Sequence, residues 1–470
     1  MPHPKLPKHD VPATRTPERP HPDAAGPGTQ RPPTPDLSTR VSPLTRRRFL
    51  ACSGVTAGAA LAAGATQVQW SDLLQAAAAG PLDPEAGVLV MVTLYGGNDG
   101  LNTVVPAADP AYQSARADLA YQPGEVLDLG EGLGLNPGLK GLHALWGSSE
   151  LAVVRGVGYP QPDRSHFRSM AIWQTASPET SLTTGWLGRW LDATTTNPLL
   201  AVSVDALVPP MLAGEKLAAA SLPLSGLKLP GGRAAGPVDR AVALLGRPSP
   251  DDGPWQARAA RSWVDLRSAV EVLGPAAPAR VGAATPTPSP SPSTDPTPED
   301  TQAQGGSAGG QGELAAQLDT VARLVELGVP TRVYSVSLGG FDTHSDERGT
   351  QERLLGVLDR ALTAFHHRLQ GTERGRQVVV AVYSEFGRRV VANASDGTDH
   401  GTAGPVLVLG RGVQGGFHGD EPSLTDLDGG DLRAGTDFRS IYATLLHRVL
   451  GADPGQVLGG WTTEVDRLIA

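Results

Sequence analysis

The sequence has almost no sulfur with which to form a disulfide or bind a metal ion. Cys52 is the only cysteine among the 470 residues, and it lies in an N-terminal segment that we expect to be removed. The rest of the chain therefore excludes disulfide bonds, thiolate zinc sites and a thiol nucleophile. Any metal ion would have to be held by oxygen atoms and imidazoles.

Long apolar runs are also missing, and positive charge is concentrated at one end. No stretch approaches the roughly 20 apolar residues of a membrane-spanning helix, so we expect no spanning segment in the mature chain. The formal net charge is -9, yet residues 1–48 carry nine Lys and Arg against four Asp and Glu. The remainder, at about -14, has no general attraction for nucleic acid or anionic lipid.

The N-terminal region is typical of a targeting signal. Residues 1–44 are rich in Pro, Thr and Asp, a composition that predicts disorder. Three arginines, Arg46 to Arg48, then precede Phe49-Leu50 and an apolar run from Ala51 to Ala65. This pattern resembles a twin-arginine signal peptide. We expect residues 1–80 to be tail plus signal, with the Tat translocase as partner and an extracellular, periplasmic or cell-envelope location. The alternative is a basic tail before an ordinary helix.

The mature chain, residues 81–470, has the pattern of one α/β domain. Apolar runs predict buried parallel strands, and two stretches with helical spacing predict helices, as does the segment that follows the N-cap candidate Asp437. Because helices alternate with strands, we predict a mainly parallel central sheet sandwiched by helices. The expected strands are 88–94, 151–157, 332–338, 378–383 and 406–409, and the expected helices are 314–327, 351–369 and 437–450.

Two regions interrupt this alternation. Residues 160–275 contain several tryptophans and helical pieces, which indicates a cap or insertion. Residues 276–312 are rich in Pro, Ser and Thr and then in Gly, which predicts a disordered linker that is extended at first and flexible later.

Polar clusters follow several of the predicted strands, where the chemistry of parallel α/β sheets is found. Asp99 lies in a glycine-rich loop after the strand 88–94. We interpret it either as a metal ligand or as the first residue of an Asx turn. Asp342 and His344, two residues apart, follow the strand 332–338. Carboxylate and imidazole can ligate one divalent ion, and a hydrogen-bonded turn is the alternative.

Two further clusters have the same form. Glu385 follows the strand 378–383 as a metal ligand or base, and Arg388 or Arg389 can hold an oxyanion. A structural Glu–Arg ion pair is the alternative. Asp399 and His400 lie in a loop directly before the strand 406–409. Since all these loops adjoin strand ends, we expect one shared site.

A fifth cluster combines a hydroxyl, an imidazole and arginines. Arg164, Ser165 and His166 are consecutive, and Ser165 is a candidate nucleophile with His166 beside it. A loop supported by Arg–Asp pairs is the alternative. A Ser-His-Asp esterase is less favoured, because no G-x-S-x-G elbow follows a strand.

Taken in order, these segments resemble the DUF1501 family, in which a Tat signal is also usual. The segments that carry the resemblance are LYGGNDGLNTVVP (94–106), RSHFRSMAIWQTA (164–176), GWLGRWLD (185–192), GGFDTH (339–344), SEFGRRV (384–390), GTDHGTAGPVLVLG (397–410) and DFRSIYATLLHRVLG (437–451).

That family is in turn similar, more remotely, to the alkaline phosphatase and sulfatase superfamily. The resemblance implies an alkaline-phosphatase-like fold and a metal-dependent hydrolase of phosphate or sulfate esters, on small-molecule or glycan substrates. It places Ser165 as nucleophile, and Arg164 or Arg388 as the ester clamp. The implied metal ligands are Asp99, Asp342, His344, Glu385 and His400, and Asp399 is a further candidate because it adjoins His400.

Two departures from the superfamily pattern bear on the metal. Asp342 and His344 are spaced more closely than in the phosphatases, and Phe386 stands where phosphatases place a histidine. These departures argue against a two-zinc site and leave one ion of zinc, calcium or magnesium, or none. A cell-envelope binding protein that retains the fold without catalysis is therefore the alternative.

Overall fold

The computed structural model describes residue 68 and residues 70–205, 207–224 and 313–470. Of the expected tail and signal (1–80), residues 1–67 and 69 lie outside the described residues, and the helix Trp70–Ala79 lies within the described part. Residue 206 and residues 225–275 of the expected insertion and the expected linker (276–312) also lie outside the described residues. None of the described helices is both long and apolar enough to cross a membrane.

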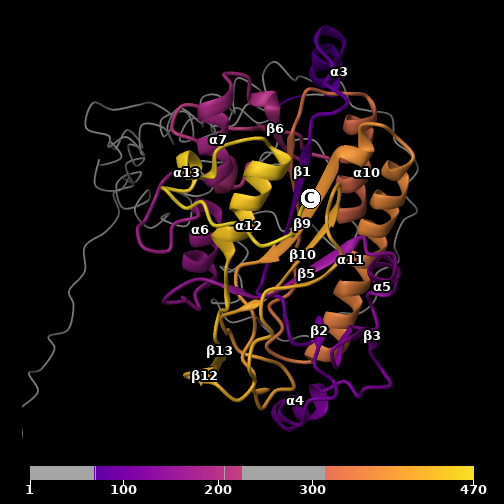
Figure 1. The fold of residues 1–470 in the computed structure, drawn as a ribbon, viewed down its shortest axis with the longest axis vertical. Coiled ribbons are helices and arrows are strands. Elements are labelled where there is room, and N and C mark those ends of the chain that lie inside the picture. Colours follow the sequence, from indigo (N-terminus) through magenta and orange to yellow (C-terminus); the bar gives the residue numbers. More distant parts are fainter. Residues whose placement is uncertain (1–67, 69, 206, 225–312) are drawn as a thin grey trace, which may run out of the picture.

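The described chain is built around a nine-stranded sheet (Figure 1). Eight strands follow the order β11-β5-β10-β9-β1-β8-β6-β7, and β14 also pairs with β5. Strand β10 is antiparallel to both of its neighbours, and the other described pairings within this sheet are parallel. The prediction of a mainly parallel sheet is confirmed. The strands are β1 Val88–Leu94, β5 Leu151–Gly158, β6 Ala201–Ser203, β7 Ala220–Ser221, β8 Val333–Leu338, β9 Val378–Ser384, β10 Gly404–Gly410, β11 Gly416–His418 and β14 Thr436–Asp437.

Helices cover both faces of the sheet (Figure 1), with α5, α10 and α11 on one side and α6, α7 and α12 on the other. The α-helices are α3 Trp70–Ala79, α4 Pro110–Arg116, α5 Lys140–Gly147, α6 His166–Thr175, α7 Trp186–Thr194, α10 Glu313–Glu326, α11 Glu347–Gln370, α12 Phe438–Thr444 and α13 Pro454–Val457. The short 3-10 helices are Ala117–Leu119, Pro198–Leu200, Pro210–Leu212 and Gly375–Gln377, and a π-helix spans Leu445–Val449.

Two small sheets lie outside the central one. They are formed by β2 Val104–Val105, β3 Leu127–Gly130 and β4 Leu133–Leu135, and by the hairpin of β12 Leu427–Asp428 and β13 Asp431–Leu432.

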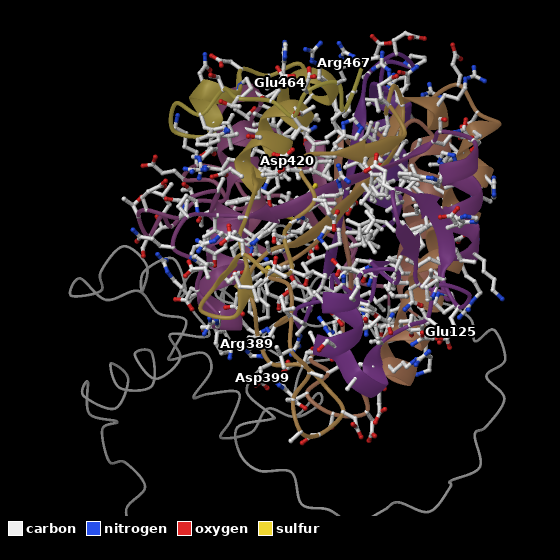
Figure 2. All side chains as sticks on the ribbon, turned by 60° about the horizontal axis from the view of Figure 1, so that its bottom comes forward. Glu125, Arg389, Asp399, Asp420, Glu464 and Arg467 are labelled. Carbon is white, nitrogen blue, oxygen red and sulfur yellow. The ribbon has the colours of Figure 1, made fainter. Side chains whose placement is uncertain are left out.

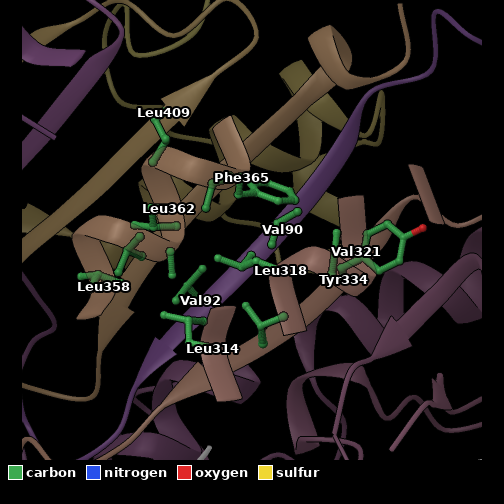
Figure 3. Close-up of a cluster of buried hydrophobic side chains, with 14 of the residues drawn as sticks. Val90, Val92, Leu314, Leu318, Val321, Tyr334, Leu358, Leu362, Phe365 and Leu409 are labelled. Carbon is green, nitrogen blue, oxygen red and sulfur yellow. The ribbon is translucent and has the colours of Figure 1, made fainter. Parts of the chain in front are cut away.

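Strand β1 shows why both faces are covered. All seven of its residues are buried, and successive side chains of a strand point to opposite faces. Val90 and Val92 therefore pack in the core beneath α10 and α11 (Figure 3). Leu89 and Met91 pack in the second core, beneath α7 and α12. A strand buried on both sides has no polar face, which is why β1 is a continuous apolar run.

Each strand and helix whose bounds were expected from the sequence lies close to a described element, with two differences of extent. Helix α11 begins at Glu347 rather than at 351, because its first turn is polar throughout and adds no apolar residue to the helical pattern, although Glu347 itself is buried. The last predicted helix is divided into α12 and a π-helical turn. Its N-cap is as predicted, since the Asp437 side chain accepts a hydrogen bond from the Arg439 amide.

Residues 160–224 are the described part of the expected cap or insertion. They contribute β6 and β7 to one edge of the central sheet and α6 and α7 to one of its faces.

The sheet directions bring the polar loops together. Strands β1, β5, β8 and β9 run in one direction and end at the same edge. Because β10 runs the opposite way, it begins at that edge. The loop before β10 therefore meets the loops that follow the other four strands.

Candidate metal centre

Three histidines converge on one carboxylate oxygen at this edge. Asp342 Oδ1 lies 3.4 Å from His166 Nε2, 3.1 Å from His344 Nε2 and 3.2 Å from His400 Nε2. His166 is the first residue of α6, Asp342 and His344 follow β8, and His400 precedes β10. Each of three separate loops thus supplies an imidazole to the same point.

Two of the imidazoles also face each other. His344 Nε2 and His400 Nε2 are 2.9 Å apart. Two bare lone pairs or two N–H groups would repel at this distance, so the two nitrogens share either one proton, in an N–H···N hydrogen bond, or a metal ion.

These distances fit a divalent metal ion. Ligand atoms about 2.0–2.2 Å from one ion lie roughly 3.3 Å apart in a tetrahedral site. His166, Asp342 and His400 each offer one ligand atom, all within 4.8 Å of one another. His166 Nε2 is buried and has no hydrogen-bond partner among the described residues, since its 3.4 Å approach to Asp342 lacks hydrogen-bond geometry. A nitrogen-rich set of this kind suits zinc and similar transition metals better than calcium or magnesium.

The outer nitrogen of each imidazole also has a partner. His166 Nδ1 lies 2.8 Å from Glu385 Oε1, and His344 Nδ1 lies 3.4 Å from Asp399 Oδ1. His400 Nδ1 donates to the backbone carbonyl of Arg164 at 2.9 Å. An acceptor at Nδ1 fixes the tautomer that leaves Nε2 free as a ligand, which is the usual arrangement around metal-bound histidine.

Arg388 stabilises the negative charge of the Asp342 carboxylate. Arg388 Nη2 donates to Asp342 Oδ1 at 2.6 Å, and the Arg388 side chain is fully buried. Burial alone would raise the pKa of Asp342, but three imidazoles and Arg388 hold this pKa well below its usual range. Asp342 is therefore a carboxylate at any physiological pH and can neutralise part of a bound cation's charge.

Nearby carboxylates also raise the pKa values of two of the imidazoles. Burial alone would lower the pKa of His166, but the carboxylates of Asp342 and Glu385 raise it to about 9. The hydrogen bond to Asp342 raises the pKa of His344. The cluster thus attracts positive charge, and a metal ion would displace the protons on entering.

Phe386 supports two of the imidazoles from the side of the core. Its ring centre lies 4.8 Å from that of His166 and 4.9 Å from that of His400. The turn after β1 approaches the other side closely, since a Cβ on Gly97, which has φ of +73°, would lie 2.2 Å from the Phe386 ring. An apolar ring therefore packs against two of the imidazoles and offers no ligand atom of its own.

Glu385 is placed differently from the predicted ligand set. Both of its oxygens have protein partners, since Oε1 accepts from the Gly96 amide and pairs with His166, and Oε2 accepts from the Ser384 hydroxyl. In this position Glu385 orients His166. Asp399 has a similar relation to His344, and it also accepts a hydrogen bond from Asn393.

Asp99 is not brought into the cluster. Its two oxygens pair with the fully buried Arg116 at 2.6 and 2.9 Å, and Oδ1 also accepts from the Leu101 amide in an Asx turn. The Asx turn considered for Asp99 is thus what the structure shows. The carboxylate lies in a buried charge network together with Arg116 and Glu347.

The predicted catalytic side chains take three different positions. Ser165 is exposed at the N-cap of α6, where its side chain does not cap the helix. Arg388 donates to the carbonyls of Gly96, Gly97, Phe341 and Thr398 as well as to Asp342. With its donors so engaged, Arg388 positions the loops and the carboxylate. The Arg164 side chain is 47% exposed and pairs with Asp431.

Three supporting residues escaped the sequence analysis. Asn393 donates to the His344 carbonyl, Thr398 donates to Glu347, and Asp431 pairs with two arginines. None of them lies at the end of a long predicted strand. No sequence motif relates them to the histidines or to Asp342. They can be recognised only in the folded structure, where loops distant in sequence come together.

The family comparison covers the C-terminal part of this site. The model of DUF1501, described as a protein of unknown function, matches residues 292–464. This part of the chain is therefore similar to the DUF1501 family. The match includes the loops that carry Asp342, His344 and His400, and it does not extend to His166 or to the other resembling segments between 94 and 192. No curated protein shows significant sequence similarity to this chain.

Solved structures similar to this chain include three bacterial proteins. One is a protein in the alkaline phosphatase superfamily from Vibrio parahaemolyticus, 11% identical with a TM-score of 0.38, covering 84% of this chain and 78% of that one. Another is a putative sulfatase from Bacteroides thetaiotaomicron, 10% identical with a TM-score of 0.30, covering 81% and 76%. The third is a phosphonate monoester hydrolase from Silicibacter pomeroyi, 14% identical with a TM-score of 0.27, covering 80% and 77%. These similarities are distant, and none of them assigns a role to a residue of this chain.

Proposed function

We propose that this chain is an exported, metal-dependent hydrolase of phosphate or sulfate esters. The observation that carries the proposal is the convergence of three Nε2 atoms on Asp342 Oδ1, with an acceptor at each Nδ1. The alternative for Asp342 and His344, a hydrogen-bonded turn, would not require imidazoles from three separate segments to face one carboxylate oxygen. His166, Asp342 and His400, joined by His344, would hold the ion.

The site is open to solvent on one side. The side chains of His344, Asp342 and His400 are 45%, 36% and 24% exposed, whereas that of His166 is 15% exposed. A bound divalent ion supplies Lewis-acid stabilisation to an ester oxygen and activates a nucleophile. Asp342 and Arg388 keep the local charge balanced while His166 is held in orientation by Glu385.

Ser165 is the candidate nucleophile of this proposal. It is exposed and immediately precedes His166, so its hydroxyl is within one residue of a metal-holding imidazole. The backbone amide of Ser165 donates to the Asp163 side chain at 2.8 Å, which fixes the local turn. If Ser165 attacks the ester, Ser165→Ala will reduce turnover at least about a hundredfold while leaving the metal content unchanged.

A binding protein without catalysis is the second candidate, and one feature favours it. Three imidazoles and a carboxylate amount to four protein ligands, which is the number that fills a closed structural zinc site. Catalytic zinc sites leave a position open. An ion held by all four groups would then stabilise the loops without acting on a substrate.

Elemental analysis of the purified mature protein tests the metal centre. We expect close to one transition-metal ion per chain, and its loss from the Asp342→Ala/His344→Ala double variant. His447→Ala is the matched control, because His447 pairs with Glu464 on the surface away from the cluster. Absence of bound metal, even after incubation with zinc, manganese, calcium and magnesium, would overturn the metal mechanism.

Ester hydrolysis separates the two candidates. The metal-loaded protein should release 4-nitrophenol from 4-nitrophenyl phosphate or 4-nitrophenyl sulfate, and a chelator should abolish the release. A stoichiometric metal ion with no turnover of either ester, together with a shift to lower unfolding temperature on chelation, would favour the binding protein.

A further inference from the structure

Two arginines next to the metal cluster share one buried aspartate. Asp431, in strand β13, has a fully buried side chain. Its Oδ2 pairs with Arg164 Nη2, and its Oδ1 lies 3.3 Å from Arg389 Nε. One carboxylate is therefore set against two guanidinium groups, and the trio keeps one net positive charge.

Both guanidinium groups remain partly open to solvent. The Arg164 side chain is 47% exposed and that of Arg389 is 34% exposed. Arg389 Nη2 donates to the Gly429 carbonyl, while Arg164 Nε and Nη1 and Arg389 Nη1 have no acceptor among the described residues. These free N–H groups are oriented by their shared partner, which is how arginine recognises anionic oxygen atoms.

The turn of the β12–β13 hairpin leaves room for this pair. Gly429 and Gly430 both have positive φ, at +59° and +91°. A Cβ on Gly430 would lie 3.2 Å from Arg389 Nη2, which is tighter than ordinary contact. A side chain at this turn would crowd the guanidinium group that the glycine leaves accessible.

Backbone contacts tie the pair to the metal cluster. The Arg164 carbonyl accepts the hydrogen bond from His400 Nδ1, and Arg164 precedes His166 by two residues, at most about 7 Å of extended chain. The Arg389 amide donates to the Asp399 carbonyl at 3.0 Å, and Figure 2 shows these two residues on the same part of the surface. The arginine pair therefore flanks the site where an ester would be cleaved.

Among the described residues, Asp431 is the only acidic residue that forms an ion pair with Arg164 or Arg389. The Asp399 carboxylate forms no ion pair with Arg389, although it lies close enough to interact with its charge. Arg388, the third arginine of this region, is buried and engaged with backbone carbonyls and Asp342. The exposed positive charge beside the cluster thus comes from Arg164 and Arg389.

We propose that Arg164 and Arg389, held by Asp431, form a subsite for a second anionic group, so that the substrate is a polyanionic ester. This inference rests on the proposed function, because the first anionic group is the ester at the metal cluster. A small monoester fills the cluster alone. A substrate with a further sulfate or phosphate group reaches the arginines as well and gains charge-assisted hydrogen bonds there.

Isothermal titration calorimetry on the metal-loaded full chain tests the subsite, with sucrose octasulfate as the polyanion and inorganic sulfate as the single anion. In the Arg164→Gln/Arg389→Gln double variant, the Kd for octasulfate should rise about tenfold or more, as expected for lost charge-assisted hydrogen bonds. The Kd for sulfate should change less than about twofold. Octasulfate binding by the native chain should weaken with added salt.

Arg433→Gln is the matched control, because Arg433 lies just beyond the same hairpin and forms an exposed pair with Asp426. It should leave both affinities unchanged. Arg389→Lys keeps the charge facing Asp431 and should fold like the native chain while losing part of the octasulfate affinity. Metal content and unfolding temperature equal to those of the native chain show that each variant is intact.

The possible outcomes distinguish a failure of the subsite proposal from a failure of the proposed hydrolase function. Unchanged octasulfate affinity in the folded double variant overturns the subsite, as does an equal loss of affinity for sulfate and octasulfate, which would make the arginines the clamp of the ester itself. Octasulfate binding that depends on the arginines, in a chain that binds no metal and cleaves no ester, overturns the proposed function and leaves an anion-binding subsite.

Discussion

Glu385 Oε1 lies 2.8 Å from His166 Nδ1, and both side chains are largely buried. The same oxygen accepts a hydrogen bond from the Gly96 amide at 2.9 Å, so the carboxylate cannot turn away from the imidazole without leaving that amide unpaired. This contact fixes which His166 nitrogen faces Asp342. Glu385, which the sequence suggests as a metal ligand, thus contacts one of the proposed ligands instead.

Glu385→Gln should weaken metal binding without abolishing it. The amide keeps the size of the side chain and loses the charge that orients His166, and such outer partners change metal affinity by about 10–100-fold. Competition with a chromophoric zinc chelator measures the change.

Glu464→Gln is the control for this variant. Glu464 forms a 2.7 Å contact with His447 Nδ1 on the surface, so the same substitution there removes a comparable pair outside the cluster. Equal zinc affinities for Glu385→Gln and the native chain would show that Glu385 does not support the metal centre.

Arg388→Lys should destabilise the fold strongly. Arg388 is 1% exposed and joins four backbone carbonyls and Asp342. A lysine cannot make this set of contacts, and each buried carbonyl left without its donor costs about 1–3 kcal/mol of unfolding free energy. Denaturant unfolding measures it. Arg433→Lys, at an exposed pair, should change the unfolding free energy by less than about 1 kcal/mol, and a similar small change at Arg388 would contradict this account.

Glu347 should make the fold less stable as the pH rises. It is fully buried with Asp99 and Arg116, and one arginine cannot balance two carboxylates. Burial, followed by the charge of Asp99, raises the pKa of Glu347 to about 9. The folded state therefore retains a proton that the unfolded chain releases above its ordinary pKa of 4.5. The stability contributed by this proton is complete below about pH 4.5 and is lost as the pH rises toward 9.

Glu347→Gln tests the sign of this effect. The amide resembles the protonated acid and can still accept the hydrogen bond that Thr398 donates to Glu347. Between pH 6 and 8.5, the unfolding free energy of the variant should fall less steeply than that of the native chain, by up to about 1.4 kcal/mol per pH unit. The measurement is denaturant unfolding in the presence of a chelator, and parallel pH curves would show that Glu347 is ionised in the fold.

Export should depend on the paired arginines near the N-terminus. Arg46→Lys/Arg47→Lys keeps the charge of the segment and changes the residues that resemble the twin-arginine signal. The variant should accumulate unprocessed inside the cell, whereas Lys5→Arg/Lys8→Arg, in the preceding tail, should be exported normally. Cell fractionation and immunoblotting follow both, and normal processing of the arginine variant would contradict the proposed Tat route.

The sequence was sufficient to predict the frame of the fold. Strand β1 is recognisable because burial on both faces demands a continuous apolar run, and α10 is recognisable from its apolar spacing. Polar residues that directly follow such strands, as Asp342 and Glu385 do, are expected to share an edge of the sheet. By itself the sequence therefore determined the mainly parallel sheet and the region in which its polar loops lie.

The roles within that region were decided only by the tertiary structure. His400 precedes its strand, and it reaches the cluster because β10 runs antiparallel to β5 and β9. Asp99 and Asp342 look alike in sequence, yet Arg116 takes the first into a buried ion pair while three imidazoles meet at the second. Local sequence sets the conformation of each loop, but a ligand differs from a structural carboxylate by partners many residues away, and only packing brings those partners together.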